Sequence, residues 1–135
     1  MAEQNTFYLE ILTPERQFYT GPAVSLVVPA VDGQMGIQPG HEPAVTAIEP
    51  GELRFLADGQ WQTAAIGSGF AEIMPDYAIL LVSFAERPEE IDLKRAQAAK
   101  QRAEERLRQQ KSVQEYYHSK AALARAMARL KTRNH

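Results

Sequence analysis

The chain has 135 residues, 44% of them hydrophobic and 24% charged, which excludes wholesale disorder and predicts one ordinary domain, or one small domain with an appendage. It has no cysteine, no apolar run of about 18 residues and no signal peptide, which excludes disulfides and thiolate metal sites and predicts neither export nor direct membrane insertion. The net charge of -2 divides into -8 for residues 1–85 (10 acidic, 2 basic) and +6 for residues 86–135 (7 acidic, 13 basic), so the two parts need different partners.

Residues 1–86 predict an antiparallel β-sandwich domain. Apolar and polar side chains alternate in short steps, for example with Phe7, Leu9 and Ile11 on one face of a strand. Turn signals rich in Gly, Pro and Asp separate these runs at close, regular intervals, which is typical of roughly eight to ten strands. The run Tyr77–Phe84 is apolar on both faces and predicts a strand in the middle of the sandwich.

The segment Asp32–Gly51 is dense in Gly, Pro and short apolar runs, and two interpretations of it remain open. Either it forms two tight turns that flank a core strand, or it presents Met35, His41 and Glu42 as part of a contact surface. Farther along, GSGF at 67–70 lacks the lysine and the spacing of a phosphate-binding loop and indicates a tight strand turn.

Residues 87–135 predict a C-terminal two-helix hairpin. Pro88, followed by Glu89, Glu90 and Asp92, is typical of a helix start, because acidic side chains favour the positive end of the helix dipole. From there to Lys131 neither Gly nor Pro occurs, and strong helix formers dominate.

A second helix start lies at Ser112, whose spacing from Glu115 is that of a capping box, with RQQK (108–111) as the link. One continuous rod of about 65 Å, at 1.5 Å per residue, is the other interpretation, and a small free-energy difference between the two would make a switch. The apolar stripe is narrow and mostly alanine, which predicts weak docking of the hairpin. Its members are Ile91, Ala98, Ala99, Ala103, Leu107, Tyr116, Leu123, Met127 and Leu130.

Four arginines of these helices are spaced to share faces. Arg95 and Arg102 are seven residues apart on the first helix, and Arg125 and Arg129 are four apart on the second. In a folded hairpin they would point four guanidinium groups at one anion, and arginine suits phosphate oxygens. The alternative is an ordinary solvated, charged helix surface.

Three segments, in the right order and covering nearly the whole chain, resemble the epsilon subunit of the F-type ATP synthase. GQMGIQPGHEPAVTAIEPG (33–51) resembles the family's GELGILPGHxPLxTxLxPG, and GSGFAEIMPD (67–76) resembles its SGGFxEVxPD. AERPEEIDLKRAQAAKQRAEERL (85–107) is similar to AERxxDIDxxRAxxAxxRAExRL. The chain departs from the pattern at Gln34, Met35 and Gln38, and the loss of the acidic residue at Gln34 weakens any transfer of a c-ring contact to that position.

The resemblance implies a non-catalytic rotor subunit that couples proton transport to ATP synthesis. Its partners would be the gamma subunit, the ring of c subunits and, when the helices extend and inhibit ATP hydrolysis, the alpha/beta catalytic hexamer. Its place would be the cytoplasmic face of the bacterial inner membrane, as a peripheral subunit. The basic C-terminal end, with Lys131 and Arg133, would be attracted to acidic surfaces of the beta subunits, an attraction that salt weakens beyond about 8 to 10 Å.

The resemblance also implies ATP as a regulatory ligand, with no required cofactor. The three histidines, His41, His118 and His135, are scattered without ligand spacing, which predicts no structural metal site. In some bacterial relatives an I/LDxxRA motif belongs to a site that binds ATP and holds the hairpin folded. The matching residues here are Glu86, Ile91, Asp92, Arg95, Ala96, Arg102, Arg125 and Arg129. The arginines would contact phosphates, while Asp92 and Glu86 would orient arginines or contact adenosine.

Three other classes of function are weighed against this role. A stand-alone nucleotide-sensing module would share the arginine site but need no gamma subunit. Nucleic-acid binding is disfavoured, because acidic residues interrupt the basic face and the acidic sandwich would repel phosphates. An enzyme is the weakest interpretation, since no cluster of nucleophile, base or metal ligands emerges.

Overall fold

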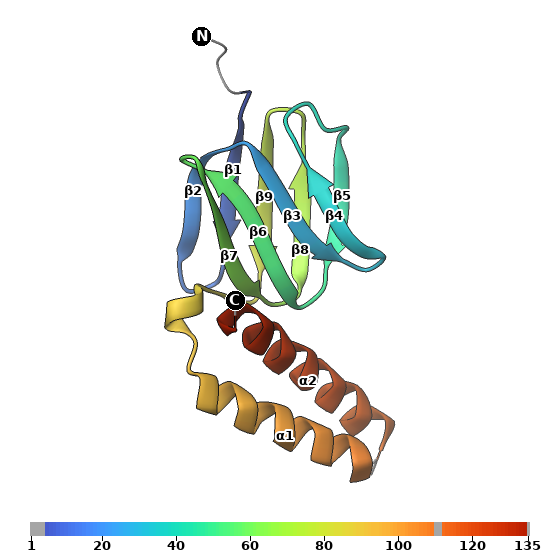
Figure 1. Cartoon of the computed structure of the whole chain (residues 1–135). Coiled ribbons are helices and arrows are strands. Elements are labelled where there is room, and N and C mark those ends of the chain that lie inside the picture. The colour runs from blue at the N-terminus through green and yellow to red at the C-terminus, as the bar shows by residue number, and fades with distance from the viewer. Residues whose placement is uncertain (1–4, 110–111, 135) are drawn as a thin grey trace.

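The computed structural model describes residues 5–109 and 112–134, which form a β-sandwich followed by two helices (Figure 1). The strands are β1 (Phe7–Leu12), β2 (Gln17–Ala23), β3 (Ser25–Ala30), β4 (Gly33–Ile37), β5 (Ala44–Ile48), β6 (Gly51–Ala57), β7 (Gln60–Ile66), β8 (Gly69–Ile73), β9 (Tyr77–Val82) and β10 (Ala85–Glu86). A short 3-10 turn, η1 (Pro88–Glu90), leads into α1 (Leu93–Gln109) and α2 (Val113–Arg133). No helix among the described residues is both long and apolar enough to cross a membrane.

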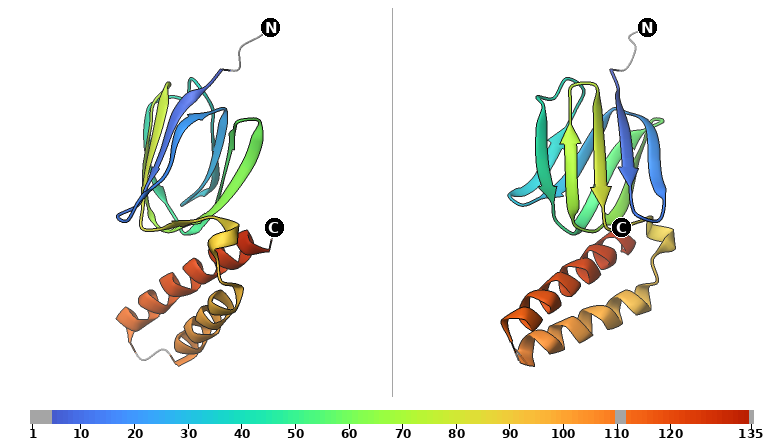
Figure 2. Two further views of the ribbon diagram at one scale, coloured as in Figure 1. Left: turned by 90° about the vertical axis from the view of Figure 1, so that its left-hand side faces the viewer. Right: turned by 180° about the vertical axis from the view of Figure 1, so that it is seen from behind.

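The strands form two layers, with the order β10-β7-β6-β3-β5-β8-β9-β1-β2 and with β4 beside β3 (Figure 2). The expected eight to ten strands are confirmed in the described part of the chain. One pairing there departs from the predicted antiparallel pattern, because β1 runs parallel to β9, with Leu9 opposite Ala78. One edge of β1 pairs with β2 in a hairpin. The other edge pairs with β9, whose direction is set by its own hairpin with β8.

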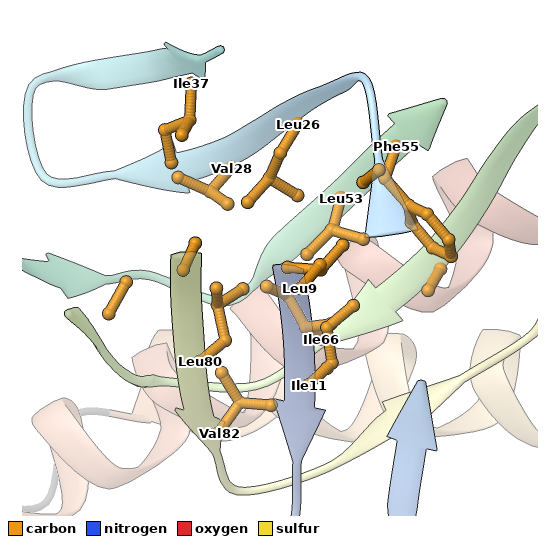
Figure 3. Close-up of a cluster of buried hydrophobic side chains, with 14 of the residues drawn as sticks. Leu9, Ile11, Leu26, Val28, Ile37, Leu53, Phe55, Ile66, Leu80 and Val82 are labelled. Carbon is orange, nitrogen blue, oxygen red and sulfur yellow. The ribbon is translucent and has the colours of Figure 1, made fainter. Parts of the chain in front are cut away.

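The core lies between the two layers and consists of the inward-facing residue of each alternating pair (Figure 3). Leu9, Leu26, Leu53 and Phe55 are fully buried there, which confirms the period-two pattern of the sequence. The prediction for residues 77–84 is wrong in one respect: Leu80 is fully buried, but its neighbour Leu81 is 41% exposed. The reason is that the described helices lie beneath one end of the sandwich and leave this outer face open.

The first helix begins later than the sequence predicts. Pro88 starts only the 3-10 turn, and Ile91 is extended (φ -90°, ψ 123°) before α1 begins at Leu93. The Asp92 side chain then accepts a hydrogen bond from the Arg95 amide (3.1 Å), as an N-cap does. The predicted start at Pro88 was therefore wrong, because the capping aspartate outcompetes the proline as the helix start.

The second helix begins at Val113, as predicted, and its cap is Ser112, whose Oγ accepts from the Glu115 amide at 3.1 Å. The two helices lie side by side as a hairpin, which is the first of the two predicted arrangements (Figures 1 and 2). Arg108 and Gln109 of the expected link belong to α1, and the remainder of that link lies outside the described residues.

The packed face of α2 differs from the predicted apolar stripe. Met127 is 51% exposed, so its assignment to that stripe was wrong. The buried side chains of α2 are instead small: Ser119, Ala126, Ala128 and Thr132. As a whole, α2 packs against α1 and against β6 and β7, and small side chains permit a close approach to these neighbours.

Candidate functional site

A cleft of about 430 Å³ lies where β10, η1 and the two helices meet. Its lining residues are Glu86, Glu90, Ile91, Asp92, Arg95, Ala96, Ala99, Arg102, Ala126 and Arg129. Seven of the eight residues expected to contact ATP are therefore brought together, although they are spread over 44 positions of the chain (86–129). The eighth expected residue, Arg125, does not line the cleft and is half-buried on α2.

The helical spacing of the arginines explains why they converge. Arg95 and Arg102 leave α1 on one side and are exposed, while Arg129 reaches the cleft from α2. The helices approach through small side chains, with Ala96 and Ala126 buried at the base of the cleft. Guanidinium groups from two different helices thus face one open volume, an arrangement suited to an anion with several oxygens.

An ion pair between Glu86 and Arg129 joins β10 to α2. The Arg129 Nε donates to Glu86 Oε1, and the guanidinium lies 4.0 Å from the centre of the Phe84 ring. This contact agrees with the expectation that Glu86 orients an arginine. The sequence did not single out Phe84, because it follows an apolar strand. In such a place the sequence alone does not show whether the ring packs in the core or against an arginine.

Ile91 fixes the floor of the cleft. It is buried together with Ala65 and Ala96, and Phe84 and Leu130 pack against this group. The cluster therefore contains residues of the sandwich and of both helices. The position of the motif residue Ile91 is set by this shared apolar contact, which would be broken if α2 left the sandwich.

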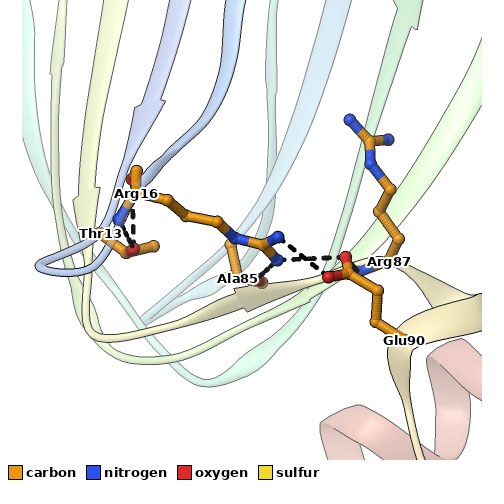
Figure 4. Close-up of polar contacts among 5 residues, drawn as sticks. All are labelled: Thr13, Arg16, Ala85, Arg87 and Glu90. Atoms are coloured by element: carbon orange, nitrogen blue, oxygen red, sulfur yellow. Dashed lines mark hydrogen bonds and ion pairs between the residues drawn. The ribbon is translucent and has the colours of Figure 1, made fainter.

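Glu90 is an acidic residue of the cleft that sequence reasoning missed (Figure 4). Its carboxylate accepts from both terminal nitrogens of Arg16, at 2.9 and 3.1 Å, and from the Arg87 amide at 2.8 Å. Arg16 Nη2 also donates to the Ala85 carbonyl at 2.7 Å. These bonds hold the pKa of Glu90 below its ordinary value, with the Arg16 hydrogen bond as the largest cause. The partners are 74 residues apart, so no local pattern announces the pair.

The residues expected to contact protein partners lie in two separate regions. Met35 is half-buried and packs against the core, so it contributes to the sandwich interior. His41 and Glu42 lie in the β4–β5 connection, at the end of the sandwich away from the helices, where His41 Nδ1 is 2.7 Å from the Glu42 carbonyl (Figure 1). Lys131 and Arg133 are exposed near the end of α2.

A further surface was not predicted as a unit, and we call it the outer apolar face. It lies on the outside of the layer formed by β5, β8, β9 and β1, and its exposed members are Tyr8, Val45, Phe70 and Leu81. The strand register places Phe70 between Leu81 and Ala47, so these three side chains are neighbours across strands, whereas Val45 lies opposite Glu72 and Tyr8 opposite Tyr77. Exposed apolar residues grouped in this way are typical of a protein-binding surface.

Comparisons with known proteins cover both parts of the chain. The family model described as ATP synthase, Delta/Epsilon chain, beta-sandwich domain matches residues 6–88, and the one described as ATP synthase, Delta/Epsilon chain, long alpha-helix domain matches residues 89–133. The chain is 53% identical to the ATP synthase epsilon chain of Ruminiclostridium cellulolyticum, over 96% of each chain. It is 53% identical to that of Caldanaerobacter subterraneus, over 93% of this chain and 92% of the relative.

A solved structure shows the same fold at low sequence identity. A chain of the Euglena gracilis mitochondrial ATP synthase matches with a TM-score of 0.84 and 22% identity, over 97% of this chain and 82% of that one. A chain from the central stalk and c-ring of the Tetrahymena thermophila mitochondrial ATP synthase matches with a TM-score of 0.64 and 11% identity, over 98% and 99%.

Proposed function

The chain belongs to the ATP synthase delta/epsilon family, and we propose that it is the central-stalk subunit that couples proton transport to ATP synthesis in an F-type enzyme. In this role it binds the gamma subunit and the c-subunit ring, as a peripheral subunit at the cytoplasmic face of a bacterial inner membrane. It is a stalk subunit and catalyses no reaction itself. Its regulatory part is the hairpin, which inhibits ATP hydrolysis when the helices extend toward the alpha/beta hexamer.

We further propose that ATP binds in the cleft and holds the hairpin folded. The observation that carries this proposal is the convergence of Arg95, Arg102 and Arg129 from two helices on one volume. A triphosphate bound there would contact α1 and α2 together, whereas an extended chain separates these helices and loses the joint contact. Because the ligand prefers the folded arrangement, it shifts the population toward it.

The pairing of Glu86 with Arg129 gives the cleft a defined shape before ligand arrives. The carboxylate fixes the guanidinium beside the Phe84 ring, which reduces the side-chain freedom that ATP binding must remove. Asp92 acts on the backbone, because it caps α1 at the Arg95 amide and so sets the direction in which Arg95 leaves the helix. Both acids thus position arginines, by different routes.

The ATP site is tested by titrating the isolated protein with ATP while recording amide NMR shifts. We expect saturable shifts around the cleft, and an affinity at least about tenfold lower in the Asp92→Ala, Arg95→Ala variant, since one phosphate contact and the helix cap are lost together. Arg95→Ala alone separates the charge from the cap. Arg108→Ala is the matched control, because Arg108 lies on the same helix and pairs with Glu105 outside the cleft. Absence of shifts in the wild type at cellular ATP concentrations would refute the site.

The basic end of α2 is expected to contribute to inhibition after the helices extend. Lys131 and Arg133 are exposed in the folded hairpin and lie outside the ATP cleft, so they can be neutralised without altering it. We expect the Lys131→Gln, Arg133→Gln variant to inhibit ATP hydrolysis several-fold less well in the reconstituted enzyme, and added salt to reduce the difference. Unchanged inhibition by the variant would exclude an electrostatic attachment to the beta subunits.

The gamma subunit is proposed to cover the outer apolar face. This face has grouped apolar side chains, while the helices cover one end of the sandwich. Covering it would remove Phe70 and Leu81 from water, and such burial contributes roughly 25 cal/mol per Å² of apolar surface. The proposal assigns the sandwich a permanent attachment to the stalk and leaves the hairpin free to change its arrangement.

A further inference from the structure

We propose that Arg16, a residue of the β1–β2 turn, is a positioning residue of the cleft, where it engages Glu90 so that the arginines of the cleft stay available to phosphate. This inference rests on the ATP site proposed above and adds to it a residue from the turn of the sandwich that lies beside η1. Arg16 does not line the cleft itself, so its effect passes through Glu90.

The contact is built from several elements, as Figure 4 shows. Thr13 shapes the turn, since its hydroxyl accepts from the Arg16 amide at 3.1 Å and donates to the Arg16 carbonyl at 3.2 Å. The Arg16 guanidinium lies 5.2 Å from the centre of the Phe18 ring, which supports one face of it. From there it reaches both oxygens of Glu90 and the Ala85 carbonyl. A two-pronged contact of this kind fixes orientation as well as charge.

The charges of the cleft show why this contact matters for an anionic ligand. The lining contains three arginines and also three carboxylates, those of Glu86, Glu90 and Asp92. Glu86 is occupied by Arg129, and Asp92 caps the α1 backbone. Glu90 would otherwise repel the phosphates or draw Arg95 away from them. Arg16 satisfies this carboxylate from outside the cleft, which leaves the cleft arginines for the ligand.

Two variants that break the same ion pair distinguish an effect of Arg16 on the charge of the cleft from a purely structural contact between the turn and η1. Arg16→Gln leaves a charged Glu90 beside the ligand, whereas Glu90→Gln removes that charge and keeps the shape of the side chain. We expect Arg16→Gln to weaken ATP binding by about tenfold at low salt, and Glu90→Gln to bind ATP at least as tightly as the wild type. The double variant should recover most of the lost affinity.

The measurement is the ATP titration by amide NMR on the full chain, with the free-state spectra confirming that each variant is folded. Equal weakening by Arg16→Gln and Glu90→Gln, with no recovery in the double variant, would show a purely structural contact and overturn the inference. Wild-type affinity in Arg16→Gln would overturn it also, while the ATP site itself would stand. Failure of the wild type to bind ATP would instead remove the proposed site, and this inference with it.

Discussion

Replacing Gly69 with alanine is expected to destabilise the sandwich by about 3 kcal/mol or more, the largest stability effect that we predict for a single methyl group. A Cβ at this position would lie 1.9 Å from the Leu81 carbonyl oxygen and 2.8 Å from the Val82 Cα. Both are backbone atoms of the neighbouring strand, and Gly69 pairs with Val82 in the β8–β9 ladder. The clash could therefore be relieved only if the two strands moved apart, because a change of side-chain rotamer does not move backbone atoms.

The effect can be measured by urea unfolding followed by circular dichroism, with Gly36→Ala as the matched control. A Cβ at Gly36, which is also in a strand, meets nothing within 4 Å, so we expect its free energy of unfolding to change by less than about 0.5 kcal/mol. Similar unfolding midpoints for the two variants would contradict the close-approach argument. A large difference between the two free energies of unfolding would explain Gly69, the second glycine of GSGF, by strand packing and not by phosphate binding.

Much of the fold was predictable because it depends on local periodicity. The alternation at Phe7, Leu9 and Ile11 identifies the buried face of β1, and the cap at Ser112 identifies the start of α2. The parallel pairing of β1 with β9 was not predictable in this way, because it joins segments about 70 residues apart and depends on which strand edges remain open. Helix starts were ambiguous wherever two signals compete, as at Pro88 and Asp92.

The cleft divides into a part that helical spacing predicts and a part that it cannot. Arg95 and Arg102 share a face by spacing alone, and the family motif adds Ile91 and Asp92. The contribution of Arg16 arises only after folding, when a turn of the sandwich meets η1. Exposure of Leu81 has the same origin, since an apolar residue in a strand is buried or open according to what covers its layer.

The second large effect is expected at the outer apolar face, where Phe70→Glu should lower the affinity for the gamma subunit by more than about 100-fold. Phe70 is 52% exposed and stands between Leu81 and Ala47 on neighbouring strands. Removing an aromatic ring from the centre of an interface costs about 2 kcal/mol or more, and an unpaired carboxylate buried in its place adds a further penalty.

The control for this experiment is Trp61→Glu, because Trp61 is 53% exposed on a strand of the opposite layer, where Arg54 lies 5.6 Å from its ring centre. Both variants exchange a half-exposed aromatic residue for the same charge, so a difference between them reports which layer gamma covers. Titration of purified gamma into each full-length variant is expected to show loss of binding for Phe70→Glu and near wild-type binding for Trp61→Glu. The reverse result would place gamma on the opposite layer, and no binding by the wild type would favour a nucleotide-sensing module that acts alone.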